Sequence, residues 1–246
     1  MHPNPQVLEV WGDFACFSRP ELKVERLSYP CITPAAARGI FDAIYAKPAE
    51  FLWQVVAIEM LAPPAYIALR RNEVKEKVNV NAVFDWMAGK RDAEPLWADG
   101  DRELLGTDAK GRTQRQTVAL KNVRYRLHGE IRPWPAHRGR QAALEAQFRR
   151  RAERGKCFYQ PYFGCREFPA WFQLVETRAE PRPDPPPVPL DLDLGWMLYD
   201  VFDLSRPGTA TDAPAVSLFR ATIRSGVLQI PEYGSPEVVK AAGGRS

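Results

Sequence analysis

Residues 117–131 read T-V-A-L-K-N-V-R-Y-R-L-H-G-E-I, and the predicted fold is built outward from this stretch. Apolar side chains lie among polar ones at Val118, Leu120, Val123, Tyr125, Leu127 and Ile131. Successive side chains of a β-strand point to opposite faces, so this alternation gathers most of the apolar groups on one face. The stretch therefore predicts a half-buried strand.

The clearest helix of the chain follows this strand, over Gln141–Gly155. Leu144, Phe148 and Ala152 form one apolar stripe at helical spacing, and Gly155 is a typical C-terminal stop. The other side of the helix is basic, with Arg149, Arg150, Arg151 and Arg154. Three consecutive arginines cover a wide arc of a helix, so they cannot all bind one phosphate.

The N-terminal half predicts a strand at Gln6–Trp11 and then a helix. Thr33 is the expected N-cap and Pro34 lies in the first turn, and Pro48 is expected to end the helix. Further along, we expect strands at Phe51–Leu61 and Ala65–Arg71 and a short helix at Val80–Met87.

These elements predict an α+β fold of the split βαβ type. A run of six prolines between Pro181 and Pro189 is typical of a surface spacer, since proline cannot pack as regular structure. Strands are expected after it at Leu194–Phe202, Ala215–Ile223 and Gly226–Ile230, the last two joined by a tight Ser225-Gly226 turn. The predicted domains are 1–180, with an insertion near 88–112, and a small antiparallel sheet at 190–235.

Composition and motifs narrow the class of protein. Of 246 residues, 45% are hydrophobic, which is enough for a core, and no apolar run is long enough to cross a membrane. The start, Met-His-Pro-Asn-Pro, lacks the pattern of a signal peptide, so we expect a cytoplasmic protein with four reduced cysteines. There is no P-loop, GxGxxG, HExxH or GxSxG motif, so neither a metal nor a cofactor is expected.

Positive charge is concentrated in one segment. Residues 110–156 hold fourteen Lys and Arg against three Glu, a net charge of +11 in a chain whose total is +4. Such a field suits a polyanion, and arginine suits phosphate because of its planar fork. A solvated, highly charged surface is the alternative interpretation.

Several motifs, in order along nearly the whole chain, carry a family resemblance. They are Trp11-Gly12-Asp13-Phe14-Ala15-Cys16, Lys23-Val24-Glu25-Arg26-Leu27, Ala36-Ala37-Arg38-Gly39-Ile40, Arg70-Arg71-Asn72-Glu73, Phe148-Arg149-Arg150-Arg151-Ala152, Gly164-Cys165-Arg166-Glu167-Phe168 and Leu194-Gly195-Trp196. Together they resemble the type I-C (Dvulg subtype) Cas-five family of CRISPR-associated proteins, within the RAMP superfamily.

The resemblance implies a ferredoxin-like (RRM-like) N-terminal domain and a small antiparallel β-sheet C-terminal domain. It implies a Cascade subunit that grips the 5′ handle of crRNA, in contact with other type I-C Cascade subunits. It also implies a metal-independent endoribonuclease that cuts CRISPR precursor RNA beside the repeat hairpin by 2′-OH attack. A non-catalytic subunit that caps the handle is the alternative, and the sequence leaves double-stranded DNA open as a further partner.

The resemblance transfers catalytic residues only in part. Tyr45 matches the family's tyrosine at the end of the first helix, although Ala46 stands where tryptophan is usual, and packing at the edge of the core is the alternative role for Tyr45. The family's Lys-His pair is missing from Gln141–Glu145. His137 is the substitute expected to act as general acid if its loop folds toward Tyr45, and an exposed loop histidine with no role is the alternative. The expected RNA-binding residues are Arg38, Lys47, Arg70, Arg138, Arg140, Arg149, Arg150, Arg151, Lys156 and Arg166.

Overall fold

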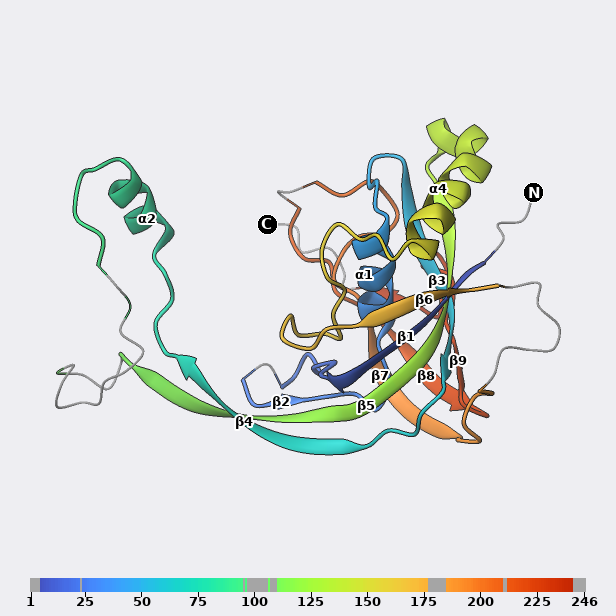
Figure 1. Ribbon diagram of the computed structural model, residues 1–246, viewed down its shortest axis with the longest axis horizontal. Helices are drawn as coiled ribbons and strands as arrows, with labels where there is room; N and C mark the ends of the chain where they lie inside the picture. Colours follow the sequence, from blue (N-terminus) through green and yellow to red (C-terminus); the bar gives the residue numbers. More distant parts are fainter. Residues whose placement is uncertain are drawn as a thin grey trace. The chain divides into compact units, whose positions relative to one another are not determined.

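The computed structural model describes residues 5–22, 24–94, 96, 106, 110–176, 185–209 and 212–240 (Figure 1). The chain forms two compact units. One unit comprises Met1–Ile67 and Val118–Ser246, and the other comprises Ala68–Thr117. The first unit contains residues 118–156, which are most of the basic segment, including its predicted helix.

Four antiparallel strands and two helices form the centre of the first unit. The strands are β1 (Gln6–Ala15), β3 (Phe51–Met60), β5 (Arg112–Pro133) and β6 (Trp171–Val175), in the order β3-β5-β1-β6. The helices are α1 (Pro34–Ile44), after β1, and α4 (Gln141–Glu153), after β5. This order confirms the predicted α+β, ferredoxin-like fold.

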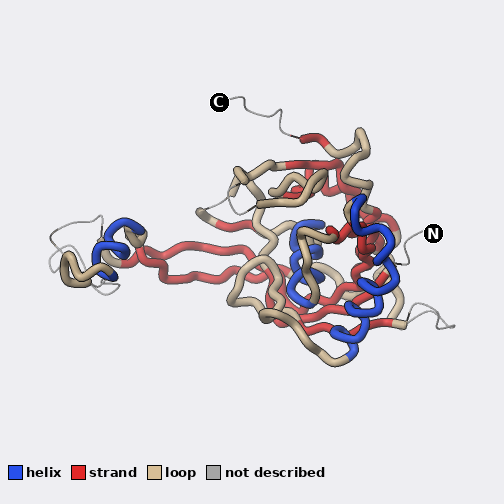
Figure 2. The backbone as a smooth tube through the Cα atoms, turned by 90° about the horizontal axis from the view of Figure 1, so that it is seen from above, coloured by secondary structure: helices blue, strands red, loops and turns tan. Residues whose placement is uncertain are grey.

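Both helices lie on the same face of this sheet, side by side (Figure 2). Phe41 of α1 stacks on Trp53 of β3 with ring centroids 4.6 Å apart, and Phe148 of α4 meets Trp53 edge-on at 4.7 Å. Aromatic pairs in these geometries stabilise the fold beyond what the burial of their apolar surface contributes. Gly129 of β5 lies directly beneath Phe41, where an added Cβ would come within 2.8 Å of the ring.

The C-terminal strands extend the same sheet. They are β7 (Leu192–Asp200), β8 (Ser217–Arg224), β9 (Val227–Gln229) and β10 (Val239–Lys240). β7 pairs with β8, and β8 forms a hairpin with β9. β9 also pairs with β3, so this hairpin joins the edge of the four-stranded sheet at β3. The predicted Ser225-Gly226 turn is confirmed, with φ values of +47° and +76°. Both residues are thus left-handed, as a two-residue hairpin turn requires.

The second unit contains most of β4 (Tyr66–Val74), the start of β5, and α2 (Val80–Met87). The helix has the predicted bounds, and the Asn79 side chain caps it by accepting from the backbone N–H groups of Asn81 and Ala82. Ala82 of this helix is buried, whereas Val80, Asn81, Phe84 and Met87 are exposed.

Several elements differ from the sequence-based expectation. α1 ends at Ile44, four residues before Pro48, because Tyr45 turns into extended backbone. The short strand β2 (Arg26–Leu27), the edge strand β6 and the 3₁₀ helix η1 (Pro135–Arg140) were not expected at all. Thr33 does cap α1, by accepting from the Ala36 N–H at 3.3 Å.

The predicted boundary between domains 1–180 and 190–235 stays a prediction, and so does the insertion near 88–112, part of which lies outside the described residues. None of the helices that the structure describes is long and apolar enough to span a membrane.

Two glycine substitutions test the packing of α1 on the sheet. Gly129→Ala should lower the free energy of unfolding by about 1–3 kcal/mol, because the new methyl group pushes the Phe41 ring out of its stack. Gly39→Ala, in α1, should raise it by about 0.5–1 kcal/mol, because the new methyl group would have no other atom within 4 Å. Urea denaturation measures both, and equal midpoints for the two variants would contradict the packing argument.

Candidate active site

A carboxylate at the start of β3 brings two cations together. Glu50 accepts from Lys47 Nζ at 2.8 Å through Oε1 and from Arg140 Nη1 at 2.6 Å through Oε2. The hydrogen bond from Lys47, the charges of Arg140 and Lys47, and the nearby His137 together lower the pKa of Glu50. The carboxylate therefore stays ionised at neutral pH and links the loop after α1 to η1.

Backbone contacts of Trp134 hold the same two segments together. Its N–H donates to the Glu50 carbonyl at 2.9 Å, and its indole Nε1 donates to the Pro48 carbonyl at 2.7 Å. Pro135 then starts η1, and the His137 N–H closes the first turn on the Trp134 carbonyl at 2.8 Å. The position of His137 relative to the end of α1 is thus fixed by two main-chain hydrogen bonds and one from the Trp134 indole to a main-chain carbonyl.

Tyr45 lies at the end of α1 beside this ion pair. Its side chain is 5% exposed, and its ring packs on Phe51 with centroids 5.3 Å apart. Burial raises the pKa of Tyr45, against the opposing charges of Lys47, Arg140 and Arg151. The phenol is therefore protonated at neutral pH, so it can donate or accept a hydrogen bond but is a poor base.

Arg151 of α4 reaches the same place from a third segment. Its Nε donates to the Ile44 carbonyl at 2.6 Å, which satisfies one of the acceptors left open at the end of α1. Its guanidinium lies 4.2 Å above the exposed ring of Phe158, whose own N–H donates to the Ala43 carbonyl at 2.7 Å.

We call these six residues, Tyr45, Lys47, Glu50, His137, Arg140 and Arg151, the Glu50 cluster. It combines a neutral phenol, an imidazole and three cationic side chains, which are groups that can orient a hydroxyl, transfer a proton and stabilise extra negative charge on a phosphate. Among the described residues, the imidazole of His137 has no hydrogen-bond partner. Among all residues that the structure describes, no group of three His, Cys, Asp or Glu side chains could hold a metal ion.

Arg38, predicted to bind RNA, lies in a buried ion-pair network instead of at this cluster. Its Nε is 2.8 Å and its Nη2 3.1 Å from the Asp200 carboxylate, and its Nη1 is 2.6 Å from Asp42. These contacts join α1 to the end of β7. The structure thus gives Arg38 two protein partners, and its contact with RNA stays a prediction.

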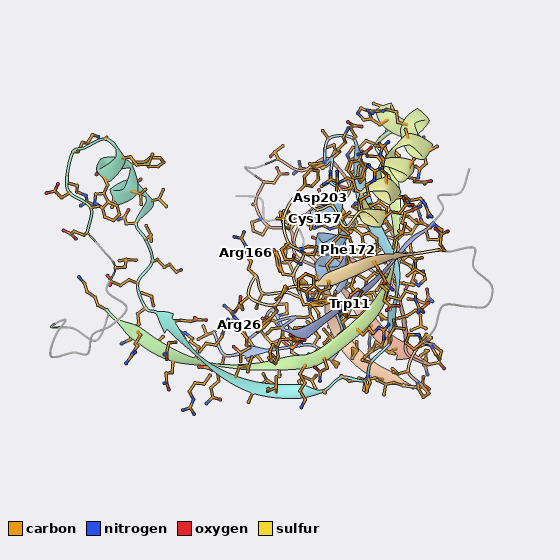
Figure 3. All side chains as sticks on the ribbon, in the orientation of Figure 1. Trp11, Arg26, Cys157, Arg166, Phe172 and Asp203 are labelled. Carbon is orange, nitrogen blue, oxygen red and sulfur yellow. The ribbon has the colours of Figure 1, made fainter. Side chains whose placement is uncertain are left out.

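The other predicted RNA ligands are dispersed. Arg149 is 3.3 Å from Glu176, and Arg150 donates to Gln147 on the same helix. Arg138, Lys156 and Arg166 are exposed, and Figure 3 labels Arg166 on the loop before β6. Arg70 is exposed on β4 and belongs to the other compact unit. Of the twelve predicted site residues, five (Tyr45, Lys47, His137, Arg140 and Arg151) therefore meet in the Glu50 cluster.

Comparison with known proteins gives matches over nearly the whole chain. The family model Cas_Cas5d, described as CRISPR-associated protein (Cas_Cas5), matches residues 7–231. The chain belongs to this family. The predicted type I-C Cas-five membership is thereby confirmed.

Two curated members of the Cas5d family are similar over almost their full length. Both are called "CRISPR pre-crRNA endoribonuclease Cas5d". The protein from Mannheimia succiniciproducens is 37% identical over 234 residues, which is 94% of this chain and 96% of that protein. The protein from Thermus thermophilus is 35% identical over 251 residues, with 97% and 96% covered.

Two solved structures share the fold at lower identity. A crystal structure of a CRISPR-associated protein superimposes with a TM-score of 0.59 at 17% identity, covering 96% of this chain and 97% of that one. A functionally uncharacterized protein from Streptococcus mutans gives 0.60 at 16% identity, with the same coverage.

The Arg38 network supplies a prediction about stability. Asp200→Ala should lower the free energy of unfolding by about 3–5 kcal/mol, because it removes one partner of a buried ion pair whose Asp200 carboxylate is 1% exposed. Asp193→Ala removes the partner of the exposed Arg220, 3.8 Å away, and should change it by less than about 1 kcal/mol. Chemical denaturation of both variants measures the difference, and a similar small loss for both would assign Arg38 no structural role.

Proposed function

We propose that this chain is a metal-independent endoribonuclease that cuts CRISPR precursor RNA at the Glu50 cluster. The activity is the one for which its two curated relatives are named. The observation that carries the site assignment is the pairing of Glu50 with both Lys47 and Arg140. It joins the end of α1, which carries Tyr45, to η1, which carries His137, although the two segments lie about ninety residues apart in sequence.

The reaction uses a nucleophile that the substrate brings. The 2′-hydroxyl attacks the adjacent phosphorus, the bond to the 5′-oxygen breaks, and the products are a 2′,3′-cyclic phosphate and a 5′-hydroxyl. Alignment of the three reacting atoms is the larger part of such catalysis. Tyr45 orients the 2′-hydroxyl by a hydrogen bond, and that proton passes to water, because the raised pKa of the phenol keeps Tyr45 itself protonated.

The remaining groups act on the phosphate and the leaving oxygen. His137, in its protonated form, donates a proton to the 5′-oxygen as it departs. Lys47 and Arg140 turn from Glu50 toward the phosphate and stabilise the charge of the phosphorane. Arg151 stays on the Ile44 carbonyl, where it holds α4 to α1 and adds positive potential.

After the cut, the protein stays bound to the 5′ handle of the crRNA as a subunit of the Cascade complex. The exposed Arg138, Lys156 and Arg166 provide cations for the RNA backbone outside the cut. Contacts with other Cascade subunits belong to the same proposal, and so does double-stranded DNA as a further ligand of the basic segment, residues 110–156.

A handle-capping subunit without catalysis is the second candidate. It is favoured by one observation, the sequence Gln141-Ala142-Ala143-Leu144-Glu145 in place of the family's Lys-His pair. Under this alternative the Glu50 cluster binds a phosphate and leaves it intact.

Cleavage of repeat RNA in the presence of EDTA separates the two candidates. The purified protein should make one cut in end-labelled repeat RNA from its own locus and leave a cyclic phosphate. Gel separation and treatment of the ends with a phosphatase identify the products. Binding without a cut, with and without added divalent metal, would establish the capping subunit.

Replacement of the catalytic phenol tests the site itself. Tyr45→Phe should slow single-turnover cleavage by roughly 10²-fold or more, with unchanged RNA affinity, because it removes only the hydroxyl that orients the nucleophile. Tyr233→Phe, in which a partly buried phenol near the C-terminus loses its 3.4 Å contact with Asp203, is the matched control and should cut normally. Normal cleavage by Tyr45→Phe would refute the assignment.

A further inference from the structure

The central sheet has a second face that the helices do not cover. Side chains directly opposite each other on neighbouring antiparallel strands lie on the same face. Leu8, Leu127 and Ile58 form one such row, buried beneath the helices. The next row, Glu9, Arg126 and Glu59, therefore points to the opposite face.

This second face carries a chain of alternating charges. Arg126 Nη2 is 3.6 Å from Glu9, Arg126 Nη1 is 2.5 Å from Glu59, and His128 Nε2 lies 2.9 Å from the same Glu59. Arg126 also donates to the Pro185 carbonyl at 3.1 Å, so the segment before β7 covers this end of the face. The buried charges here are paired within the protein.

The next row on this second face, formed by Trp171, Trp11 and Arg124, is exposed to solvent. Trp11 of β1 lies directly opposite Trp171 of β6 on one side and Arg124 of β5 on the other. Trp11 is 36% and Trp171 54% exposed, which is unusual for the largest apolar side chains. Figure 3 shows Trp11 and Phe172 on opposite sides of β6, which places the tryptophan row away from the helices.

A cavity of about 600 Å³ adjoins this row. Trp11 and Leu61 form apolar parts of its wall, and Asp13, Asn122, Gln173 and Arg124 supply polar groups. Glu9 fixes the Arg124 side chain by a 2.8 Å hydrogen bond to its Nε, while 44% of that side chain remains exposed. The volume suits a ligand of the size of a nucleotide.

We propose that this face binds single-stranded RNA next to the repeat hairpin, with bases stacked on Trp11 and Trp171. We call it the tryptophan face, comprising Trp11, Trp171, Arg124, Asn122 and Gln173. The inference rests on the proposed function and adds a second contact to it, remote from the scissile phosphate. Exposed aromatic rings on a sheet are a recurrent platform for unpaired bases, and the amides of Asn122 and Gln173 can bond to base edges.

The tryptophan face lacks the excess of positive charge that the basic segment carries. Arg124 is offset by Glu9, and Asp13 adds a negative charge to the cavity wall. Phosphate neutralisation therefore contributes little here, and the affinity comes from stacking. The polar cavity wall also favours nucleobases over an apolar protein surface, since the centres of protein interfaces are depleted in charge.

Binding of repeat RNA with its single-stranded flank tests the proposal. Trp11→Leu and Trp171→Leu should each weaken binding by about 5- to 150-fold, the equivalent of one lost base stack. Trp11→Phe, which keeps a ring, should recover most of the affinity. Trp196→Leu is the matched control, because Trp196 is 51% exposed on β7 and should have no effect.

The salt dependence of the same affinities separates stacking from charge. The slope of log Kd against log salt concentration should be the same in the leucine variants as in the original protein, whereas Arg140→Ala should reduce it by about one. RNA trimmed to the hairpin alone should bind the leucine variants and the original protein equally well. A changed slope in the leucine variants, or an equal loss with the trimmed RNA, would overturn the assignment.

Photocrosslinking covers the case in which a leucine variant fails to fold. Repeat RNA with 5-iodouridine in its flank, bound to the original protein and irradiated, should yield a crosslinked peptide that contains Trp11 or Trp171.

Normal RNA cleavage and binding with crosslinks only elsewhere would refute the tryptophan face and leave the proposed function intact. Loss of Cascade assembly in the leucine variants, with unchanged RNA affinity, would assign the face to a protein partner. Absence of RNA binding by the original protein would refute the proposed function itself.

Discussion

The contact of the Phe41 ring with the bare backbone of Gly129 is the constraint on which the rest of the first unit depends. It allows α1 to lie close to the sheet, and the same ring stacks on Trp53, which in turn meets Phe148 of α4. One aromatic group thus sets the height and direction of both helices. The end of α1 carries Tyr45, and α4 carries Arg151, so this packing also decides where the two meet.

Charged side chains divide into two kinds according to their partners. Arg38 and Arg126 are held inside the protein by carboxylates of distant strands, and their main effect is on the stability and register of the fold. Lys47 and Arg140 are paired with a carboxylate at the surface, where a stronger anion can replace it. The net charge of the basic segment does not distinguish these two kinds, although it indicated the class of ligand.

The sequence was most informative where a local rule determines the structure. Thr33 and Pro34 identified the start of α1, and Leu144, Phe148 and Ala152 identified the buried stripe of α4. Strand β6 was missed because Trp171–Val175 is a short edge strand with partly exposed apolar residues and no alternation. Of the site, Tyr45 came from resemblance, and His137 was chosen as the nearest substitute for the missing Lys-His pair. Glu50 and Trp134 were missed, since their role depends on segments brought together only by folding. The spacing of Lys47 and Glu50, three residues apart, was the one local signal of that link.

Under the proposed function, the carboxylate of Glu50 occupies the place that the RNA phosphate would take between Lys47 and Arg140. Any phosphate that enters must first compete with a tethered anion whose effective concentration is high. Free phosphate and short nucleotides meet this competitor with a single contact each, whereas a long RNA can add the energy of many distant contacts. Under the same proposal, Glu50 is an internal mimic of the ligand that sets a threshold for binding, so the cluster would select polymers without reading a single base.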